Sequence, residues 1–259
     1  MNSESEEMEN PMAHVLLEIC CGSIDDAIEA EKGGADRVEL CSALFLGGLT
    51  PSVGTLQEAK RRLKIPIMVM VRPRGGGFCY TEAEMATMER DAEAAIENGA
   101  DGVVFGILKS DGRIDLARCG RIRQLIGKCQ AVFHRAFDVT PDPFEALEQL
   151  VDLNMTRILT SGQKESVPEG AQLIKRLIER AGDRIEILPG GGIQLWNAKE
   201  VIERTGCRQV HLTAAGTAFD PSTQARPEIT FGGALHPAEN RYQMTDAKLV
   251  RALSAMLRS

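Results

Sequence analysis

The sequence has no long apolar run, no Cys-x-x-Cys motif and no excess of basic residues, and each absence argues against a class of protein. No apolar stretch approaches the ~18 residues that suggest a membrane span. The seven cysteines form no Cys-x-x-Cys motif, which argues against a structural zinc knuckle. A net charge of −7 argues against general nucleic-acid binding, although a few arginines can still form a local positive site.

What is present is an ordinary soluble composition, with 43% hydrophobic and 26% charged residues in 259 positions. Residues 1–10 are polar and acidic, unlike the start of a secretory leader. We therefore expect a disordered tail over residues 1–12, one domain over residues 13–259, and a cytoplasmic protein. An odd number of cysteines without a secretory signal favours reduced thiols over disulfides.

Eight short runs rich in β-forming residues recur along the chain, and a helix-like segment follows each of the first seven. The runs are HVLLEIC (14–20), RVELC (37–41), IMVMV (67–71), GVVFG (102–106), AVFH (131–134), RILT (157–160), IEIL (185–188) and QVHL (209–212). Alternating strands and helices imply parallel pairing through right-handed crossovers. Eight such units predict an α/β fold, a (β/α)8 TIM barrel of a single domain. An open doubly wound sheet is the alternative, disfavoured because no Gly-x-Gly-x-x-Gly follows the first run.

Helix starts and one long segment complete the predicted layout. Four residues stand at positions typical of helix N-caps, namely Ser23, Ser52, Thr81 and Asp142. Residues 214–243 show no clear periodicity, and a loop of this length inside a compact domain is usually functional or disordered. We interpret this segment as an irregular lid or interface element, and residues 244–257 as a final helix.

Carboxylates and thiols lie near the carboxyl ends of the first two predicted strands. Glu18 and Cys20 are separated by one residue on the first strand, and Glu39 and Cys41 repeat this spacing on the second. Residues two apart share a strand face, so each glutamate lies on the side of its cysteine. The outer side of a barrel strand packs under helices, which places these side chains inside the barrel or at its mouth. Active sites of such barrels lie at this end.

Other polar or flexible residues follow the remaining strands. They are Arg72 and Arg74 after the third strand, His134, Arg135 and Asp138 after the fifth, Thr160 in the sixth, Gly190, Gly191 and Gly192 after the seventh, and His211 in the eighth. The glycine turn resembles a phosphate cradle ahead of a helix, and a simple tight turn is an equal alternative. The charged groups could also form a structural ion-pair ring, although buried charges are poor stabilisers.

Taken together, these stretches resemble the copper homeostasis protein CutC family. The resemblance runs in order through LEICC (17–21), GGADRVELC (33–41), GGLTPS (47–52), VRPRGG (71–76), FHRAFD (133–138), RILTSGQ (157–163) and PGGGI (189–193), and covers roughly residues 15–213. It implies a (β/α)8 barrel, a link to copper tolerance and copper binding, and Cys20 and Cys41 as candidate ligands. The final stretch HLTAAGTAFDPSTQ departs from the serine-containing version expected of the family.

The first function hypothesis is a copper protein. Cu(I) favours soft thiolates. Neighbouring strands lie about 4.8 Å apart, so Cys20 and Cys41 could share one ion at the mouth of the barrel. The adjacent Cys21 is expected to point into the strand–helix layer. The alternative for the pair is that free cysteines are often only small buried hydrophobes.

The second hypothesis is an enzyme of the isomerase, aldolase or lyase type that acts on a small anionic or phosphorylated metabolite. The catalytic candidates are Glu18, Glu39, His134 and Asp138. The substrate-binding candidates are Arg72, Arg74, Arg135, Thr160, Gly190, Gly191, Gly192 and His211. No lysine ends a strand, which disfavours a Schiff base. Under either hypothesis the expected partner is a copper ion or a small anion, and we expect a homodimer without nucleic-acid or membrane partners.

Overall fold

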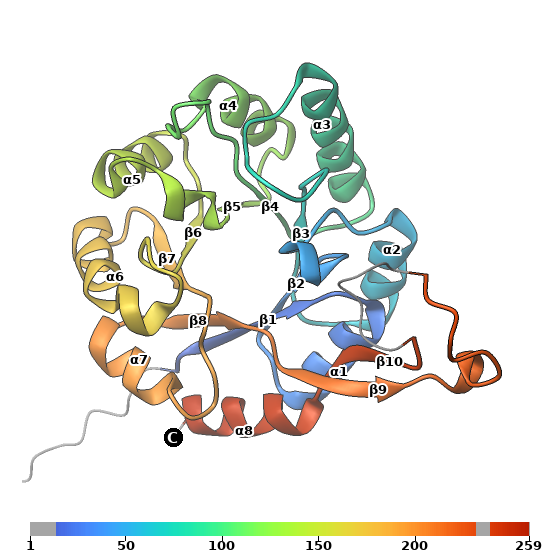
Figure 1. Ribbon diagram of the computed structural model, residues 1–259. Coiled ribbons are helices and arrows are strands. Elements are labelled where there is room, and N and C mark those ends of the chain that lie inside the picture. Colours follow the sequence, from blue (N-terminus) through green and yellow to red (C-terminus); the bar gives the residue numbers. More distant parts are fainter. Residues whose placement is uncertain (1–13, 232–238, 259) are drawn as a thin grey trace, which may run out of the picture.

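The computed structural model describes residues 14–231 and 239–258, so the predicted tail over residues 1–12 lies outside the described residues. Eight strands form one parallel sheet (Figure 1). They are β1 (Leu16–Cys21), β2 (Arg37–Leu40), β3 (Ile67–Met70), β4 (Gly102–Phe105), β5 (Gln130–Phe133), β6 (Arg157–Thr160), β7 (Glu186–Pro189) and β8 (Gln209–Leu212). All eight predicted strands are present, with ends shifted by no more than two residues.

Eight helices surround the sheet in the order in which they follow the strands (Figure 1). They are α1 (Ile24–Gly33), α2 (Val53–Arg62), α3 (Glu82–Glu97), α4 (Leu116–Leu125), α5 (Pro143–Asp152), α6 (Val167–Ala181), α7 (Ala198–Thr205) and α8 (Ala247–Leu257). The four predicted caps, Ser23, Ser52, Thr81 and Asp142, each accept a backbone N–H of the first turn. Each cap satisfies a donor that the helix cannot pair internally.

The sheet closes into a barrel. Hydrogen-bonded neighbours run from β7 through β1 to β8, and every pair in this sheet is parallel. β7 and β8 meet at an isolated parallel bridge between Gly190 and His211. The single-domain TIM barrel is therefore confirmed, and the open sheet is excluded. Among the described residues, no helix is both long and apolar enough to cross a membrane.

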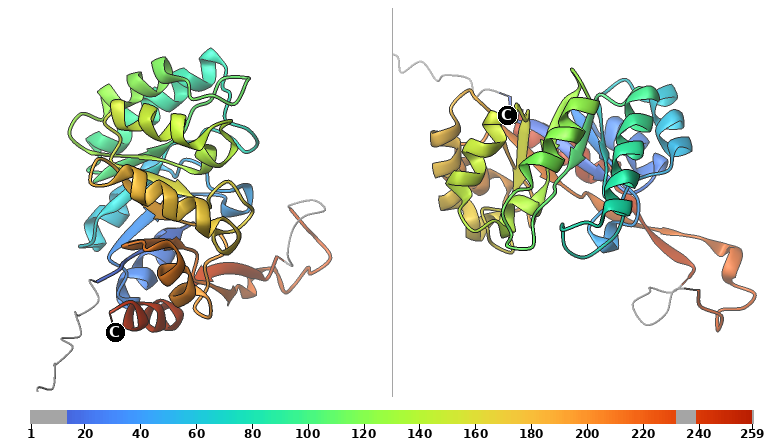
Figure 2. Two further views of the ribbon diagram at one scale, coloured as in Figure 1. Left: turned by 90° about the vertical axis from the view of Figure 1, so that its left-hand side faces the viewer. Right: turned by 90° about the horizontal axis from the view of Figure 1, so that it is seen from above.

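The segment 214–243 contains regular structure that its sequence pattern did not predict. β9 (Ala215–Phe219) and β10 (Arg241–Thr245) pair antiparallel and form a ribbon that projects beyond the ring of helices (Figures 1 and 2). The irregular assignment is wrong for these strands, because their pairing joins residues more than 20 positions apart and leaves no local period. Residues 232–238 lie outside the described residues. The role as lid or interface stays a prediction.

Two apolar layers and one polar layer fill the molecule. A large apolar layer lies between the strands and the helices and includes Cys21, as predicted. A smaller cluster fills the barrel interior with Cys20, Cys41, Met68, Met70, Val104, Val132, Leu159 and Leu188. Charged and amide side chains from the first positions of several strands lie inside the barrel as well. This polar interior sets the electrostatics of the site above it.

Candidate functional site

A cavity of about 670 Å³, here called the mouth cavity, lies at the carboxyl ends of the strands. Its lining includes Cys20, Glu39, Met70, Arg72, Phe78, His134, Arg135, Asp138, Leu159, Lys164, Glu165 and His211. Seven predicted site residues therefore meet around one space, including members from β1, β2 and β8. The volume is in the range of small-molecule sites.

Cys20, Glu39 and His211 form the tightest group of potential metal ligands in the described chain, with one donor atom of each within 4.8 Å of the others. Strand register explains the group, because Cys20 lies opposite Glu39 across β1 and β2. Cys20 Sγ lies 3.2 Å from Glu39 Oε2, within hydrogen-bond distance, and His211 Nε2 lies 3.8 Å from the same oxygen. The predicted partner Cys41 lies one step further along, with its Sγ 3.4 Å from Glu39 Oε2.

The four side chains shift one another's pKa values. The neighbouring Cys41 thiol and the His211 imidazole outweigh burial and lower the pKa of Cys20 to about 5. Burial and the adjacent Cys20 raise the pKa of Glu39 well above its ordinary value. Burial opposes the charge of His211, but the carboxylates of Glu39 and Glu18 raise its pKa overall. The lowered pKa of Cys20 and the raised pKa of His211 favour a thiolate beside an imidazolium, which is the environment of a reactive cysteine.

Glu18 lies below this group and not in the lining of the mouth cavity. Its Oε1 is 2.7 Å from His211 Nδ1, and its Oε2 accepts from Arg37 Nε. Burial opposes ionisation, but Arg37, His211 and Arg157 lower the pKa of Glu18 to about 2. A carboxylate held in this way orients the imidazole and is a weak base. Its predicted catalytic role stays a prediction.

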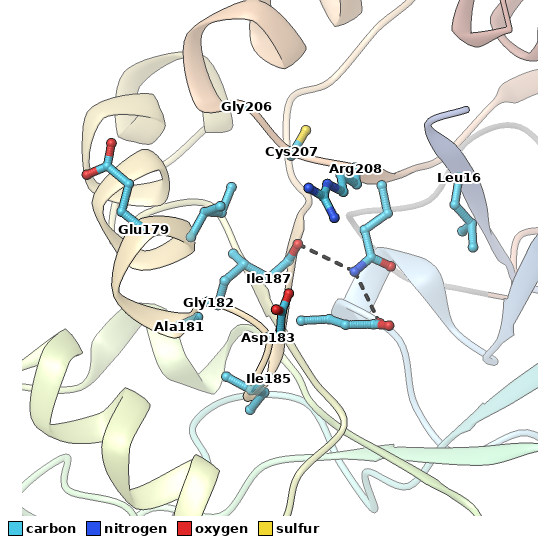
Figure 3. A pocket seen from close by; sticks show the side chains of 13 residues that line it. Leu16, Glu179, Ala181, Gly182, Asp183, Ile185, Ile187, Gly206, Cys207 and Arg208 are labelled. Atoms are coloured by element: carbon cyan, nitrogen blue, oxygen red, sulfur yellow. Dashed lines mark hydrogen bonds between the residues drawn. The ribbon is translucent and has the colours of Figure 1, made fainter. Parts of the chain in front are cut away.

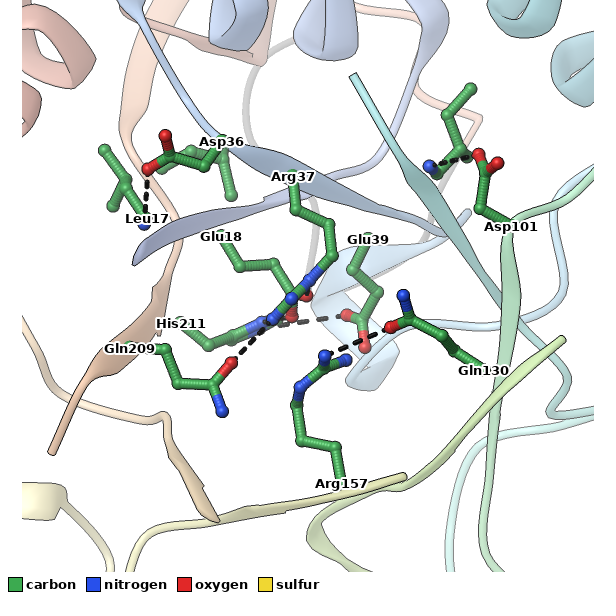
Figure 4. A network of polar contacts seen from close by, with 12 residues as sticks. Leu17, Glu18, Asp36, Arg37, Glu39, Asp101, Gln130, Arg157, Gln209 and His211 are labelled. Carbon is green, nitrogen blue, oxygen red and sulfur yellow. Dashed lines mark hydrogen bonds and ion pairs between the residues drawn. The ribbon is translucent and has the colours of Figure 1, made fainter. Parts of the chain in front are cut away.

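The polar layer around Glu18 was missed by the sequence analysis. Figure 4 shows Glu18, Arg37, Gln130, Arg157, Gln209 and His211 pointing toward one another inside the barrel. Arg37 also donates to Gln209 Oε1 at 2.9 Å, and Arg157 to Gln130 Oε1 at 3.1 Å. The signal was available, because Arg37 shares the strand face of Glu39 and Cys41. Arg37 was not predicted because it stands at the start of its strand, and a site is expected at the carboxyl end.

His134 is buried at the end of β5 and lines the mouth cavity. Its Nδ1 accepts the Ala136 N–H at 3.1 Å, so the proton of the neutral ring lies on Nε2. Burial and the nearby Arg72 charge lower the pKa of His134 to about 3, which keeps the ring neutral. No described residue accepts a hydrogen bond from Nε2.

The three arginines that were expected to bind an anion have different partners in the structure. Arg72 is buried, and its Nη1 and Nη2 donate to the backbone carbonyls of Leu46, Gly48 and Gly76. Arg74 does not line the cavity and pairs instead with Glu84 at the start of α3. The structure therefore does not bring Arg74 to the predicted site. The bidentate grip expected of Arg72 is occupied by loop carbonyls.

Arg135 lines the cavity and is anchored to its rim. Its Nε donates to Asp138 Oδ2 at 2.8 Å, and its Nη2 donates to Ser161 Oγ at 2.6 Å. Asp138 also accepts from the Thr160 hydroxyl and from the Gln163 N–H. These contacts tie together the loops after β5 and β6. Roles for Asp138 and Thr160 in catalysis or binding stay predictions.

The glycine turn after β7 differs from the predicted phosphate cradle. The Gly190 N–H donates to the Thr160 carbonyl, and Gly191 lies against Arg135 with a φ of 112° that disfavours a side chain. Within the described chain, Gly190, Gly191 and Gly192 are not part of the cavity lining. The next helix begins only at Ala198. Close contacts account for the glycines in this turn, and its role as a phosphate cradle stays a prediction.

A second cavity of about 580 Å³ lies at the opposite end of the barrel, between β7, β8, α6 and α7. Figure 3 shows Asp183, Gly206, Cys207 and Arg208 around it. Gln209 Nε2 crosses the gap between the two strands and donates to Glu186 Oε2 at 3.2 Å. No predicted site residue lines this cavity, so the mouth cavity is the candidate site.

Comparison with known proteins gives the family. A model of the family described as CutC matches residues 15–216. The chain belongs to the CutC family. A CutC family protein of Treponema denticola is 51% identical over 233 residues, which cover 90% of this chain and 95% of that protein. The human copper homeostasis protein cutC homolog is 43% identical over 244 residues, 94% of this chain and 89% of that protein.

Solved structures agree with this assignment. A CutC protein of Streptococcus agalactiae, 40% identical, superposes with a TM-score of 0.74 and covers 77% of this chain and 98% of that one. A phosphoribosylanthranilate isomerase of Thermotoga maritima, 13% identical with a TM-score of 0.54, covers 92% of this chain and 95% of that one and shares the fold alone. The CutC resemblance predicted from the sequence is confirmed.

Proposed function

We propose that this CutC family member binds Cu(I) in the mouth cavity through the Cys20 thiolate, with Cys41 and His211 as further ligands. The observation that carries the proposal is the grouping of Cys20, Glu39 and His211 donors within 4.8 Å of one another. Thiolate and imidazole are ligands that copper accepts, and Cu(I) prefers sulfur. The human relative's name, a copper homeostasis protein, agrees with this choice of ion.

The layer below the group supports a metal site. His211 turns Nδ1 to the Glu18 carboxylate, which leaves Nε2 on the side of Cys20 and Glu39. A carboxylate behind a histidine fixes the ring and raises its basicity in many metal sites. Glu39 Oε1 is buried and accepts no hydrogen bond from a described residue. A bound cation would compensate that oxygen and the neighbouring thiolate.

The test is a competition titration of reduced protein with a chromophoric Cu(I) chelator in the absence of oxygen. Cys20→Ser is expected to weaken Cu(I) binding at least about tenfold, the scale on which metal sites respond to such losses. Cys207→Ser is the matched control, because Cys207 is also buried but lines the cavity at the other end of the barrel. Equal affinity of Cys20→Ser and wild type would exclude this site.

A thiolate site requires a reducing setting. All seven cysteines are free in the structure, and we infer from this a reducing, cytoplasmic environment. The predicted homodimer remains a proposal, and sedimentation equilibrium of the full chain tests it. A monomer at all accessible concentrations would contradict it.

A further inference from the structure

Arg72 is a buried cation without an acidic partner. Its side chain is 6% exposed, and among the described residues no carboxylate lies within ion-pair distance of it. Its two terminal nitrogens donate to neutral carbonyls, and its Nε has no hydrogen-bond acceptor. The Tyr80 hydroxyl lies near the guanidinium and interacts with it, but it is a neutral group and makes no well-aligned hydrogen bond to it. A buried charge left in this state is strongly unfavourable.

His134 presents a second unused donor in the same cavity wall. Its imidazole is 4% exposed, and its Nε2–H has no acceptor in the described chain because Nδ1 is already engaged by the Ala136 N–H. Because the ring is neutral, it forms no ion pair, and it can offer a ligand one hydrogen bond from Nε2. A buried N–H without an acceptor is unfavourable, and a ligand that accepts from it would remove that cost.

Phe78 joins the two groups. The Arg72 guanidinium lies 5.3 Å from the centre of the Phe78 ring, and the His134 ring centre lies 4.9 Å from it. Phe78 follows three glycines, and a Cβ at Gly77 would meet no atom within 4 Å. Arg74 donates to the Gly77 and Cys79 carbonyls on either side of Phe78, so the backbone is held, and only the half-buried Phe78 ring would turn aside to uncover both donors. We call Arg72, Phe78 and His134 the donor wall.

We infer that the donor wall binds the carboxylate of a small monoanionic metabolite. Arg72 supplies one positive charge without an acidic partner, and Arg72 Nε and His134 Nε2 supply two N–H groups without an acceptor. A carboxylate offers one negative charge and two oxygens, which match these groups. A phosphate dianion would bring a second charge above Cys20 and Glu39, and the arginine fork that would hold it is occupied by Leu46, Gly48 and Gly76. This site is separate from the copper ligands and does not depend on the copper proposal.

The experiment uses the full chain, reduced and freed of metal, with L-lactate as the probe. The ring nitrogens of His134 are followed by NMR, because a hydrogen bond to a carboxylate shifts Nε2 and its proton. We expect a saturable shift with a dissociation constant on the order of 1 mM or tighter. Arg72→Gln should weaken lactate binding at least about tenfold. Arg74→Gln is the matched control, since Arg74 lies two residues away and outside the cavity.

Several results would overturn the inference. They are no saturable shift of His134 in wild type, equal binding of inorganic phosphate or glycerol, and equal losses in the Arg72 and Arg74 variants. If Arg72→Gln fails to fold, the wild-type measurement with lactate, phosphate and glycerol decides alone. Arg72→Gln should also retain Cu(I) binding, so failure of the copper proposal and failure of this one are distinguishable.

Discussion

Replacing Arg37 by methionine tests the buried polar layer directly. Arg37 and Glu18 are both almost fully buried and form an ion pair inside the barrel. Methionine keeps much of the side-chain volume and removes the charge, which leaves Glu18 with His211 as its nearest cation. Removing one partner of a buried pair typically costs about 3–5 kcal/mol. That is a large share of the roughly 5–15 kcal/mol that stabilises a typical domain.

The pKa of Glu18 gives an independent magnitude. A carboxyl group with an ordinary pKa of 4.5 and a folded-state pKa of about 2, set by Arg37, His211 and Arg157 against burial, gains about 3 kcal/mol from folding. Because the pKa of Glu18 is lower in the folded state than in the unfolded state, this stabilisation is complete above pH 5 and is lost as the pH falls through about 2. Arg37 is one of three cations that set this shift, so the difference in unfolding free energy between wild type and Arg37→Met should narrow as the pH falls from 5 to 3.

The assay is urea unfolding followed by far-UV circular dichroism at several pH values. Fluorescence is a poor probe, because the single tryptophan, Trp196, is already 81% exposed. Arg61→Met is the control, since Arg61 pairs with Glu58 on the exposed surface of α2, and its loss should have little effect on the free energy of unfolding. A loss below about 1 kcal/mol in Arg37→Met, or a loss that is the same at pH 7 and pH 3, would refute the reasoning.

Three further outcomes are expected. Cys41 and His211 lower the pKa of Cys20 to about 5, so in metal-free protein Cys20 should react with iodoacetamide down to about that pH. Burial raises the pKa of Cys119 to about 12, so Cys119 should stay unmodified at pH 7. Peptide mass spectrometry measures the labelling of both cysteines, and equal labelling would contradict the assignment. Gly106→Ala should cost about 1–3 kcal/mol in urea unfolding, because its Cβ would meet the His134 ring at 2.5 Å, and an unchanged midpoint would contradict this close approach. Thr81→Ala removes the hydroxyl that accepts the Glu84 N–H in the α3 capping box, although the backbone N–H of residue 81 can still donate to Glu84, and it should cost about 1 kcal/mol in thermal unfolding; a neutral result would show that water replaces the cap.

The order of strands and helices could be predicted because its signals are local. Each strand is a short apolar run, and several helices begin at a side chain that caps the first turn, as Ser52 and Asp142 do. The repetition of these units along the chain then determines the barrel, since parallel neighbours joined by right-handed crossovers close after eight strands. The β9–β10 ribbon escaped prediction because its pairing is not local.

The site was predicted only in part, and register is the reason. The repeated Glu-x-Cys pattern correctly placed Glu39 and Cys20 inside the barrel. It could not show that Cys20 lies opposite Glu39, and that His211 from the other end of the chain completes the group. Residues two apart share a face of one strand, but the register between strands decides which residues of neighbouring strands lie opposite each other.

The sequence by itself determined a one-domain barrel, its polar mouth and its family. Those conclusions rest on periodicity, on capping residues and on motifs that are each contained within a few positions. Only the tertiary structure decided which donors are already used, such as the Arg72 fork on loop carbonyls and the Arg74 pair with Glu84. Hydrogen-bond partners are chosen by distance in space, and the chain closes those distances only when the barrel forms.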